Sequence, residues 1–185
     1  MSRILLLAAV LWAGSLFLKN DLLEASTVLA LNLEQMTNRA DTIFTGRVVS
    51  QRAGWNADHT RIYTYITFDV EHYLKGGNSG GKTTVRLLGG RVGPVIAHLP
   101  GTPKFIEGEE VLLFCAGREA RIPSVLGLSL GKFTITTDPL RGRVVKRDIS
   151  TLVLANYNTQ LKRLGSPVRR YQLTDIVNLI ESYQQ

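Results

Sequence analysis

The sequence predicts a small, mainly β protein: a five-stranded OB-like barrel with a short N-terminal helix and a C-terminal amphipathic helix. Three observations support this prediction. Short segments rich in β-branched and aromatic residues recur along the chain, and glycine- and proline-containing turns separate them. No helical segments alternate with them, as a parallel sheet would require. With 185 residues, the chain has room for one domain and short appendages.

Five segments are expected to form the strands of the barrel. The second is the strongest strand candidate, because apolar residues alternate with polar ones along it. The fourth is the most hydrophobic, and the fifth is expected to bend near its two glycines. In order, the segments are Thr42 to Gln51, Arg61 to Leu74, Thr83 to Leu88, Val111 to Cys115 and Ser124 to Thr137.

The connections between these strands have the composition of turns and loops. Residues 53–60 are expected to form a polar loop, and residues 75–82 a glycine-rich turn. Residues 89–103 hold four glycines and three prolines, which predicts an irregular excursion with a short edge strand. Residues 143–146 are expected to add a last short strand.

Two helices are expected outside the barrel. Asn32 is followed three residues later by Gln35, a capping-box pattern that predicts a short helix over Leu33 to Met36. Thr174 is expected to cap the C-terminal helix of residues 174–183. The apolar side of that helix would consist of Ile176, Val177, Leu179 and Ile180. Residues 31–147 are therefore assigned to the barrel and residues 148–185 to a C-terminal extension.

The N-terminus indicates export. Residues 1–30 are interpreted as a signal peptide, because Arg3 precedes an apolar stretch from Ile4 to Leu18 that is short for a membrane span. Cleavage is expected after Ala30, with Ala25 as the second option and an uncleaved membrane anchor as the alternative. We therefore expect a periplasmic or extracellular protein, held at the inner membrane if the signal is retained.

Composition limits the classes of partner and site. The 22 basic and 15 acidic residues give a net charge of +7, which favours acidic partners, although a basic surface also serves solubility alone. Cys115 is the only cysteine, so neither an intrachain disulfide nor a cysteine-based zinc site can form. Its apolar neighbours predict a buried structural thiol.

One set of segments resembles a known family. It comprises Arg39 to Val48, Phe68-Asp69-Val70, Tyr73-Leu74-Lys75-Gly76 and Glu107 to Phe114. Together these resemble exported OB-barrel proteins of the netrin-like and tissue-inhibitor-of-metalloproteinase (TIMP-like) superfamily, including bacterial relatives, over Leu33 to Thr137. The resemblance implies an OB barrel and no enzymatic activity. The N-terminal cysteine and the disulfides of the inhibitors are missing, so it does not imply their zinc-chelating chemistry.

Two motifs resemble catalytic or nucleotide-binding loops, but neither has the required context. Gly76 to Thr83 matches the phosphate-binding loop formula, yet a β pattern follows it where a helix is needed, which favours a hairpin connection. Gly127 to Gly131 matches the nucleophile elbow around Ser129, yet a strand continues beyond it and no histidine follows.

The remaining polar residues predict no metal or catalytic site. His59, His72 and His98 share no metal-binding spacing. Asp69 and Glu71 could form an acid/base pair or a calcium site, but pairing with cross-strand Arg or Lys is the commoner use of such residues. The sequence therefore indicates no catalytic residue, no cofactor and no metal.

The candidate binding residues are Trp55, Arg61, Tyr63 and Tyr65. Three of them lie on the polar side of the second strand, next to the loop that holds Trp55. OB barrels bind extended ligands by stacking on aromatic rings and pairing with basic groups, and Tyr and Trp also anchor protein partners. The alternative is that Tyr63 and Tyr65 pack under the C-terminal helix or under residues 92–99.

The function expected from these features is that of an exported, non-enzymatic binding module for a protein or an extended polymer. An exported hydrolase or protease inhibitor of another type is the second hypothesis. A nucleic-acid-binding barrel is the third, because the charge and the aromatic face suit it but export does not. Membrane contact is expected only through an uncleaved signal.

Overall fold

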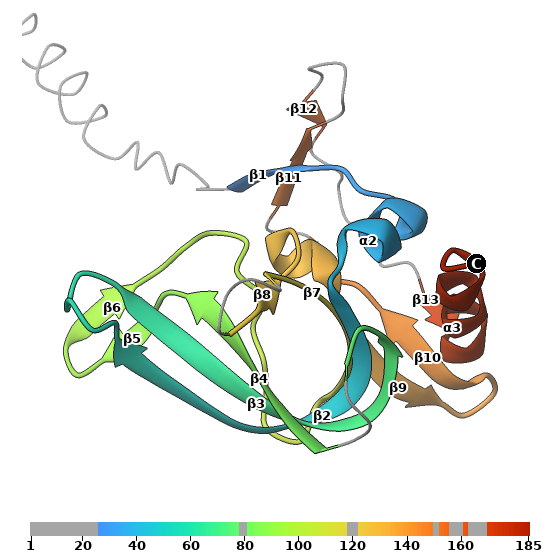
Figure 1. Cartoon of the computed structure of the whole chain (residues 1–185), viewed down its shortest axis with the longest axis horizontal. Helices are drawn as coiled ribbons and strands as arrows, with labels where there is room; N and C mark the ends of the chain where they lie inside the picture. Colours follow the sequence, from blue (N-terminus) through green and yellow to red (C-terminus); the bar gives the residue numbers. More distant parts are fainter. Residues whose placement is uncertain (1–25, 78–80, 118–121, 150–151, 156–160, 163–169) are drawn as a thin grey trace, which may run out of the picture.

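The computed structural model describes residues 26–77, 81–117, 122–149, 152–155, 161–162 and 170–185. In these residues the fold is mainly β, with a large, strongly curved antiparallel sheet and two helices (Figure 1). The apolar segment Ile4 to Leu18 lies outside the described residues. No helix in the described part of the chain is long and apolar enough to cross a bilayer.

The large sheet has the strand order β13-β10-β9-β7-β2-β3-β4, with β8 paired to β7. Its described strands thus form an open path that ends at β13 and β4. The bounds are β2 Thr42–Trp55, β3 Ile62–Lys75, β4 Gly81–Leu88, β7 Glu110–Ala116, β8 Ser124–Val125, β9 Lys132–Asp138, β10 Gly142–Lys146 and β13 Arg170–Gln172.

Two smaller sheets flank the large one. A hairpin of β5 (Gly90–Val92) and β6 (Val95–Ala97) occupies part of the predicted irregular excursion, which was expected to hold only one short strand. β1 (Ser26–Leu29) runs parallel to β11 (Leu152–Ala155), and β12 (Leu161–Lys162) pairs with β11. The sequence did not predict this second small sheet.

The predicted strand positions are confirmed, but several boundaries move. β2 continues to Trp55 instead of ending at Gln51, which shortens the polar loop. The side-chain oxygen of Asn56 accepts hydrogen bonds from the backbone N–H groups of Thr60 and Arg61, both at 2.8 Å, and so closes that loop.

The fifth predicted strand is two strands, β8 and β9. A 3-10 turn over Leu128–Gly131 separates them. The turn follows Gly127, whose φ of 62° lies in the left-handed region that glycine adopts without strain. The expected bend near the glycines is therefore a complete break in the strand.

The large sheet buries apolar side chains on both faces. Neighbouring residues of β2 show this: Phe44 packs inside the curve of the sheet with Phe68, while Ile43 packs on the opposite face under the helices with Phe114. Because side chains alternate along a strand, a sheet covered on both faces yields two separate core clusters. One of these clusters lines the inside of the curve, and the other lies beneath the helices.

The first helix, α2, spans Leu33–Arg39 and begins with the predicted capping box. Asn32 Oδ1 accepts from the backbone N–H of Gln35 at 2.7 Å, and Gln35 Oε1 accepts from that of Asn32 at 3.1 Å. The capping box is thus confirmed, and the helix extends one turn beyond the predicted Met36.

The second helix, α3, spans Leu173–Ser182 and differs from the prediction at its start. Thr174 is not its N-cap. β13 leads directly into α3, so the extended backbone of Gln172 occupies the cap position and makes no side-chain cap bond. The predicted apolar side is also partly wrong: Leu173 is buried, whereas Leu179 is 45% exposed.

The C-terminal helix belongs to the same core as the sheet. Ile176 and Ile180 are buried in one cluster with Ile43 and Phe114. Gln184 Nε2 also donates a hydrogen bond to the carbonyl of Leu74, at the end of β3, at 3.0 Å. The helix is therefore anchored at the C-terminal end of β3.

β3 shows the predicted alternation over most of its length, since Ile62, Ile66, Phe68 and Val70 are buried. The pattern changes beyond Val70. Thr45 of β2 pairs with His72 and Gly46 pairs with Val70, so Glu71 is the extra residue of a bulge. A strict alternation along this strand would place Tyr73 on the polar side with Tyr63 and Tyr65. The bulge instead lets Tyr73 pack on Phe44 with ring centroids 5.9 Å apart.

Candidate functional site

Tyr63 and Tyr65 lie on the outer face of the β2–β3–β4 part of the sheet, away from the inner core residue Ile66. Cross-strand pairing decides their neighbours, because directly opposite residues project from the same face. Tyr65 lies between Arg52 of β2 and Arg86 of β4. The pairing thus places a tyrosine between two arginines at the centre of this face.

The second tyrosine is bound to the same arginine. The guanidinium carbon of Arg86 lies 4.6 Å from the centroid of the Tyr63 ring, which is a cation–π contact. Both tyrosines are half-buried, and Arg52 is exposed. We call Arg52, Tyr63, Tyr65 and Arg86 the aromatic–basic face.

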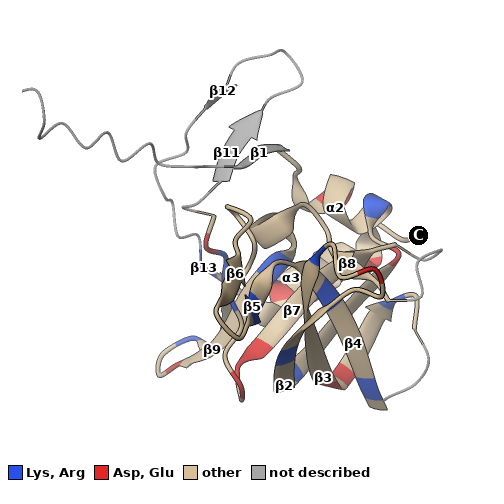
Figure 2. Ribbon diagram, turned by 90° about the vertical axis from the view of Figure 1, so that its left-hand side faces the viewer, with Lys and Arg blue, Asp and Glu red and all other residues tan. Residues whose placement is uncertain are grey.

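The aromatic–basic face differs in charge from the other end of the sheet. There Arg143 binds Glu71 through two hydrogen bonds of 3.1 and 2.9 Å and also contacts Glu110, which in turn pairs with Arg47. Within the described part of the chain, Arg52 and Arg86 have no carboxylate partner. Figure 2 shows basic segments on both β2 and β4. Carboxylates therefore neutralise the arginines at one end of the sheet, whereas Arg52 and Arg86 at the other end can bind an anionic ligand.

Trp55 does not share this face. It pairs with Ile62, whose side chain points inward, so Trp55 occupies the opposite face from Tyr63. Its ring stacks on that of His59, with centroids 6.3 Å apart and planes 26° apart. The structure therefore brings Trp55 together with the loop rather than with the two tyrosines.

Trp55 and Arg61 meet at a surface hollow of about 520 Å³ at the end of the sheet. Leu88 and Val95 also line this hollow, and each is at least 40% exposed. The predicted residues thus form two groups: Tyr63 and Tyr65 on the outer face, and Trp55 and Arg61 at the hollow at the end of the sheet.

The C-terminal helix does not cover the aromatic–basic face. α3 packs against α2, β10, β13 and the far end of β3 near Leu74 (Figure 1). Neither Tyr63 nor Tyr65 packs against the core clusters formed by the described residues. The alternative in which α3 buries the two tyrosines is therefore wrong.

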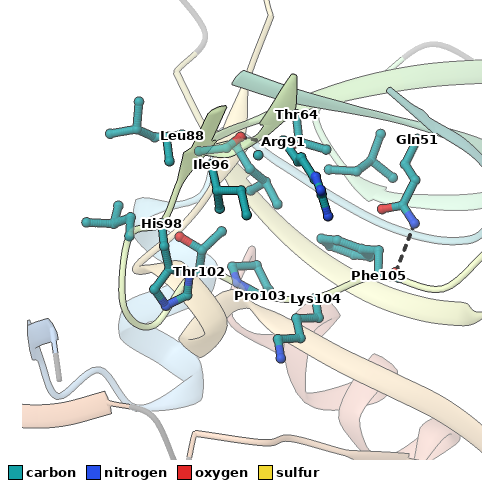
Figure 3. Close-up of a pocket in the computed structure, with 16 residues that line it drawn as sticks. Gln51, Thr64, Leu88, Arg91, Ile96, His98, Thr102, Pro103, Lys104 and Phe105 are labelled. Carbon is teal, nitrogen blue, oxygen red and sulfur yellow. Dashed lines mark hydrogen bonds between the residues drawn. The ribbon is translucent and has the colours of Figure 1, made fainter. Parts of the chain in front are cut away.

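A second cavity opens on the inner side of the same strands (Figure 3). Its volume is about 410 Å³, and its walls come from β2, β3, β4, the β5–β6 hairpin and residues 98–105. It shares Leu88 and His98 with the hollow next to Trp55. This cavity was not predicted, since its walls come from segments far apart in the sequence.

An ion pair with little exposure lies next to residues 104–105 of the cavity wall, since Lys132 Nζ also donates to the carbonyl of Lys104. Lys132 Nζ lies 2.8 Å from both carboxylate oxygens of Glu109, and the two side chains are 12% and 14% exposed. Glu109 also accepts from Thr134 Oγ1 at 2.7 Å, while Lys132 Nζ lies 4.5 Å from the ring centroid of Phe105. Burial lowers the pKa of Lys132, and the hydrogen bond to Glu109 opposes that shift.

The motifs that resemble catalytic or nucleotide-binding loops have the structures predicted from their context. β4 follows the glycine-rich loop at Gly81, where a phosphate loop would need a helix. Ser129 lies in the 3-10 turn, is buried and is followed by β9. Cys115 is fully buried, as predicted, and burial raises its pKa to about 12.

The polar candidates also have defined surroundings. Of the two neighbouring carboxylates, Glu71 pairs with an arginine as expected, but that arginine is on β10 rather than on an adjacent strand. Among the described residues, no group of three His, Cys, Asp or Glu side chains could hold a metal ion.

No protein-family model matches this chain, and no curated protein matches its sequence. The candidate site therefore rests on its own geometry.

Proposed function

We propose that this protein is an exported, non-enzymatic binding module. It holds an extended, acidic segment of a partner protein or polymer on the aromatic–basic face. The observation that carries this proposal is the position of Tyr65 between Arg52 and Arg86, neither of which has a carboxylate partner among the described residues. Aromatic rings and cations that alternate on an open strand face suit an extended anionic chain.

The proposal includes an OB-like barrel, for which two contacts give support. β8 pairs with β7, and the backbone N–H of Arg86 on β4 donates to the carbonyl of Pro123, just before β8, at 2.8 Å. These contacts would complete a ring in the order β2-β3-β4-β8-β7. An OB fold is a five-stranded, partly open barrel that binds ligands across its strand face. A distant relationship to netrin-like and TIMP-like proteins remains part of this proposal.

Titration with poly-L-glutamate tests the proposal, with binding followed by isothermal titration calorimetry at several salt concentrations. The double variant Tyr63→Ala/Tyr65→Ala should lose binding while its circular dichroism spectrum stays that of the folded protein. The matched control is Lys82→Gln, which removes a cation from the other end of β4. Equal binding by the double variant and the control would refute the proposed face.

Two further measurements distinguish the proposed function from nucleic-acid binding and from hydrolase activity. A single-stranded oligonucleotide that binds more tightly than poly-L-glutamate at equal salt, with a steep salt dependence, would favour a nucleic-acid-binding barrel. Hydrolase activity that disappears in Ser129→Ala would favour the enzyme hypothesis. Either result would replace the proposed function.

A further inference from the structure

The inner cavity has the chemical character of a small-molecule site. Its deep wall consists of the buried apolar side chains of Ile66, Leu87 and Phe105. Arg91 and Lys104 also line it and are exposed. The volume of about 410 Å³ falls within the range of roughly 300–1,000 Å³ typical of ligand pockets. The cavity therefore combines an apolar interior with cations at its opening.

The two cations are free to bind an anion. Within the described residues, neither Arg91 nor Lys104 pairs with a carboxylate. The only side-chain hydrogen bond of Arg91 there goes to the carbonyl of Gly93, at 3.2 Å, within its own hairpin. A ligand headgroup at the opening would thus meet two cations without displacing an existing ion pair.

The cavity walls are held in place by hydrogen bonds. Thr64 Oγ1 donates to the carbonyl of Gly89 at 2.8 Å, which joins β3 to the start of the hairpin. Gln51 Nε2 donates to the carbonyl of Phe105 at 3.3 Å on the opposite side. Preformed walls reduce the ordering cost of binding.

From these observations we infer that the cavity binds a small carboxylate amphiphile with a single aliphatic chain. The chain lies against Ile66, Leu87 and Phe105. The carboxylate lies toward Arg91 and Lys104. This site is separate from the aromatic–basic face, because Thr64 and Ile66 project to the inner side of β3 and Tyr63 and Tyr65 to the outer side.

Isothermal titration calorimetry with monomeric decanoate tests this inference. We expect saturable binding of one decanoate per protein, weaker binding of decan-1-ol and no binding of decyltrimethylammonium. The double variant Arg91→Gln/Lys104→Gln should weaken decanoate binding about tenfold or more, as expected for lost charge-assisted hydrogen bonds. Lys82→Gln is the matched control and should bind like the wild type.

No saturable decanoate binding, equal binding of decan-1-ol, or unchanged binding by the double variant would overturn the inference. The Tyr63→Ala/Tyr65→Ala variant should still bind decanoate, so failure of the proposed function and failure of this site are distinguishable.

Discussion

Arg86 of β4 lies over the ring of Tyr63 on β3, with its guanidinium carbon 4.6 Å from the ring centroid. The same arginine is the cross-strand partner of Tyr65, so one cation lies next to both half-buried tyrosine rings. The contact fixes the guanidinium on the outer face while leaving it without a carboxylate partner in the described part of the chain. Arg86 is therefore positioned to bind an anion.

Replacement of Arg86 should affect binding more than stability. Exposed cation–π contacts contribute about 0.5–1 kcal/mol, so Arg86→Gln should lower the free energy of unfolding by no more than about 1 kcal/mol. Urea denaturation measures this change. Poly-L-glutamate binding should weaken and its salt dependence should become shallower, because one cation fewer contacts the polymer. A large loss of stability would instead assign Arg86 a structural role.

The Glu109–Lys132 pair should be important for stability. Glu109→Ala leaves the amino group of Lys132 with little exposure and without its ion-pair partner, and removal of one partner of a buried pair costs about 3–5 kcal/mol. Chemical denaturation should show a lower midpoint with a similar slope. The control Glu107→Ala removes an exposed carboxylate two residues away and should be nearly neutral. Equal effects of the two substitutions would contradict this account of the pair.

The Glu71–Arg143 pair should make a small contribution that depends on pH. The hydrogen bond from Arg143 lowers the pKa of Glu71 below its ordinary value of 4.5. A lowered folded-state pKa means that the pair stabilises the protein above pH 4.5 and that this contribution is lost as the pH falls through the lowered pKa.

Because the two side chains are 44% and 40% exposed, we expect Glu71→Gln to cost less than about 1 kcal/mol at neutral pH. The difference from the wild type should vanish in acid. Thermal unfolding of both proteins from neutral pH down to pH 2–3 checks this. A difference that grows as the pH falls would show the opposite linkage.

The structure also bears on the expected processing site. Ser26–Leu29 pairs residue by residue with Leu152–Ala155, and Leu29 and Ala30 pack against the core beneath the helices. Cleavage after Ala30 would remove all of β1, whereas cleavage after Ala25 would keep it. As part of the proposed export, we therefore expect the mature chain to begin at Ser26. Intact-mass analysis of protein recovered from the cell envelope or the medium measures this, and a chain that begins at Leu31 would contradict it.

The sequence predicted local features more fully than long-range ones. The capping box at Asn32 and the buried residues of β3 depend on spacings of two to four residues, and both were correct. Arg52 and Arg86 were missed as site residues because cross-strand register places them next to Tyr65. The bulge at Glu71 likewise depends on pairing with β2, which explains the error at Tyr73.

The separation of Trp55 from the tyrosines has a similar origin. As a loop residue, Trp55 could have approached either face of the sheet. The extension of β2 to Trp55 and its pairing with Ile62 assign it to the inner side. The prediction missed β13 because this short strand has little periodicity. The pairing of β13 with β10 determines where α3 begins, so the start of that helix was also predicted wrongly.

The most direct test of the central claim is NMR mapping of the surface that binds poly-L-glutamate. Backbone amide shifts of the labelled protein would be followed during a titration at low salt. We predict that the largest changes fall on Arg52, Tyr63, Tyr65 and Arg86, with little change at Arg47 and Arg143, whose charges are already paired. Changes centred on α3 or on the paired arginines, or no saturable change at all, would contradict the account.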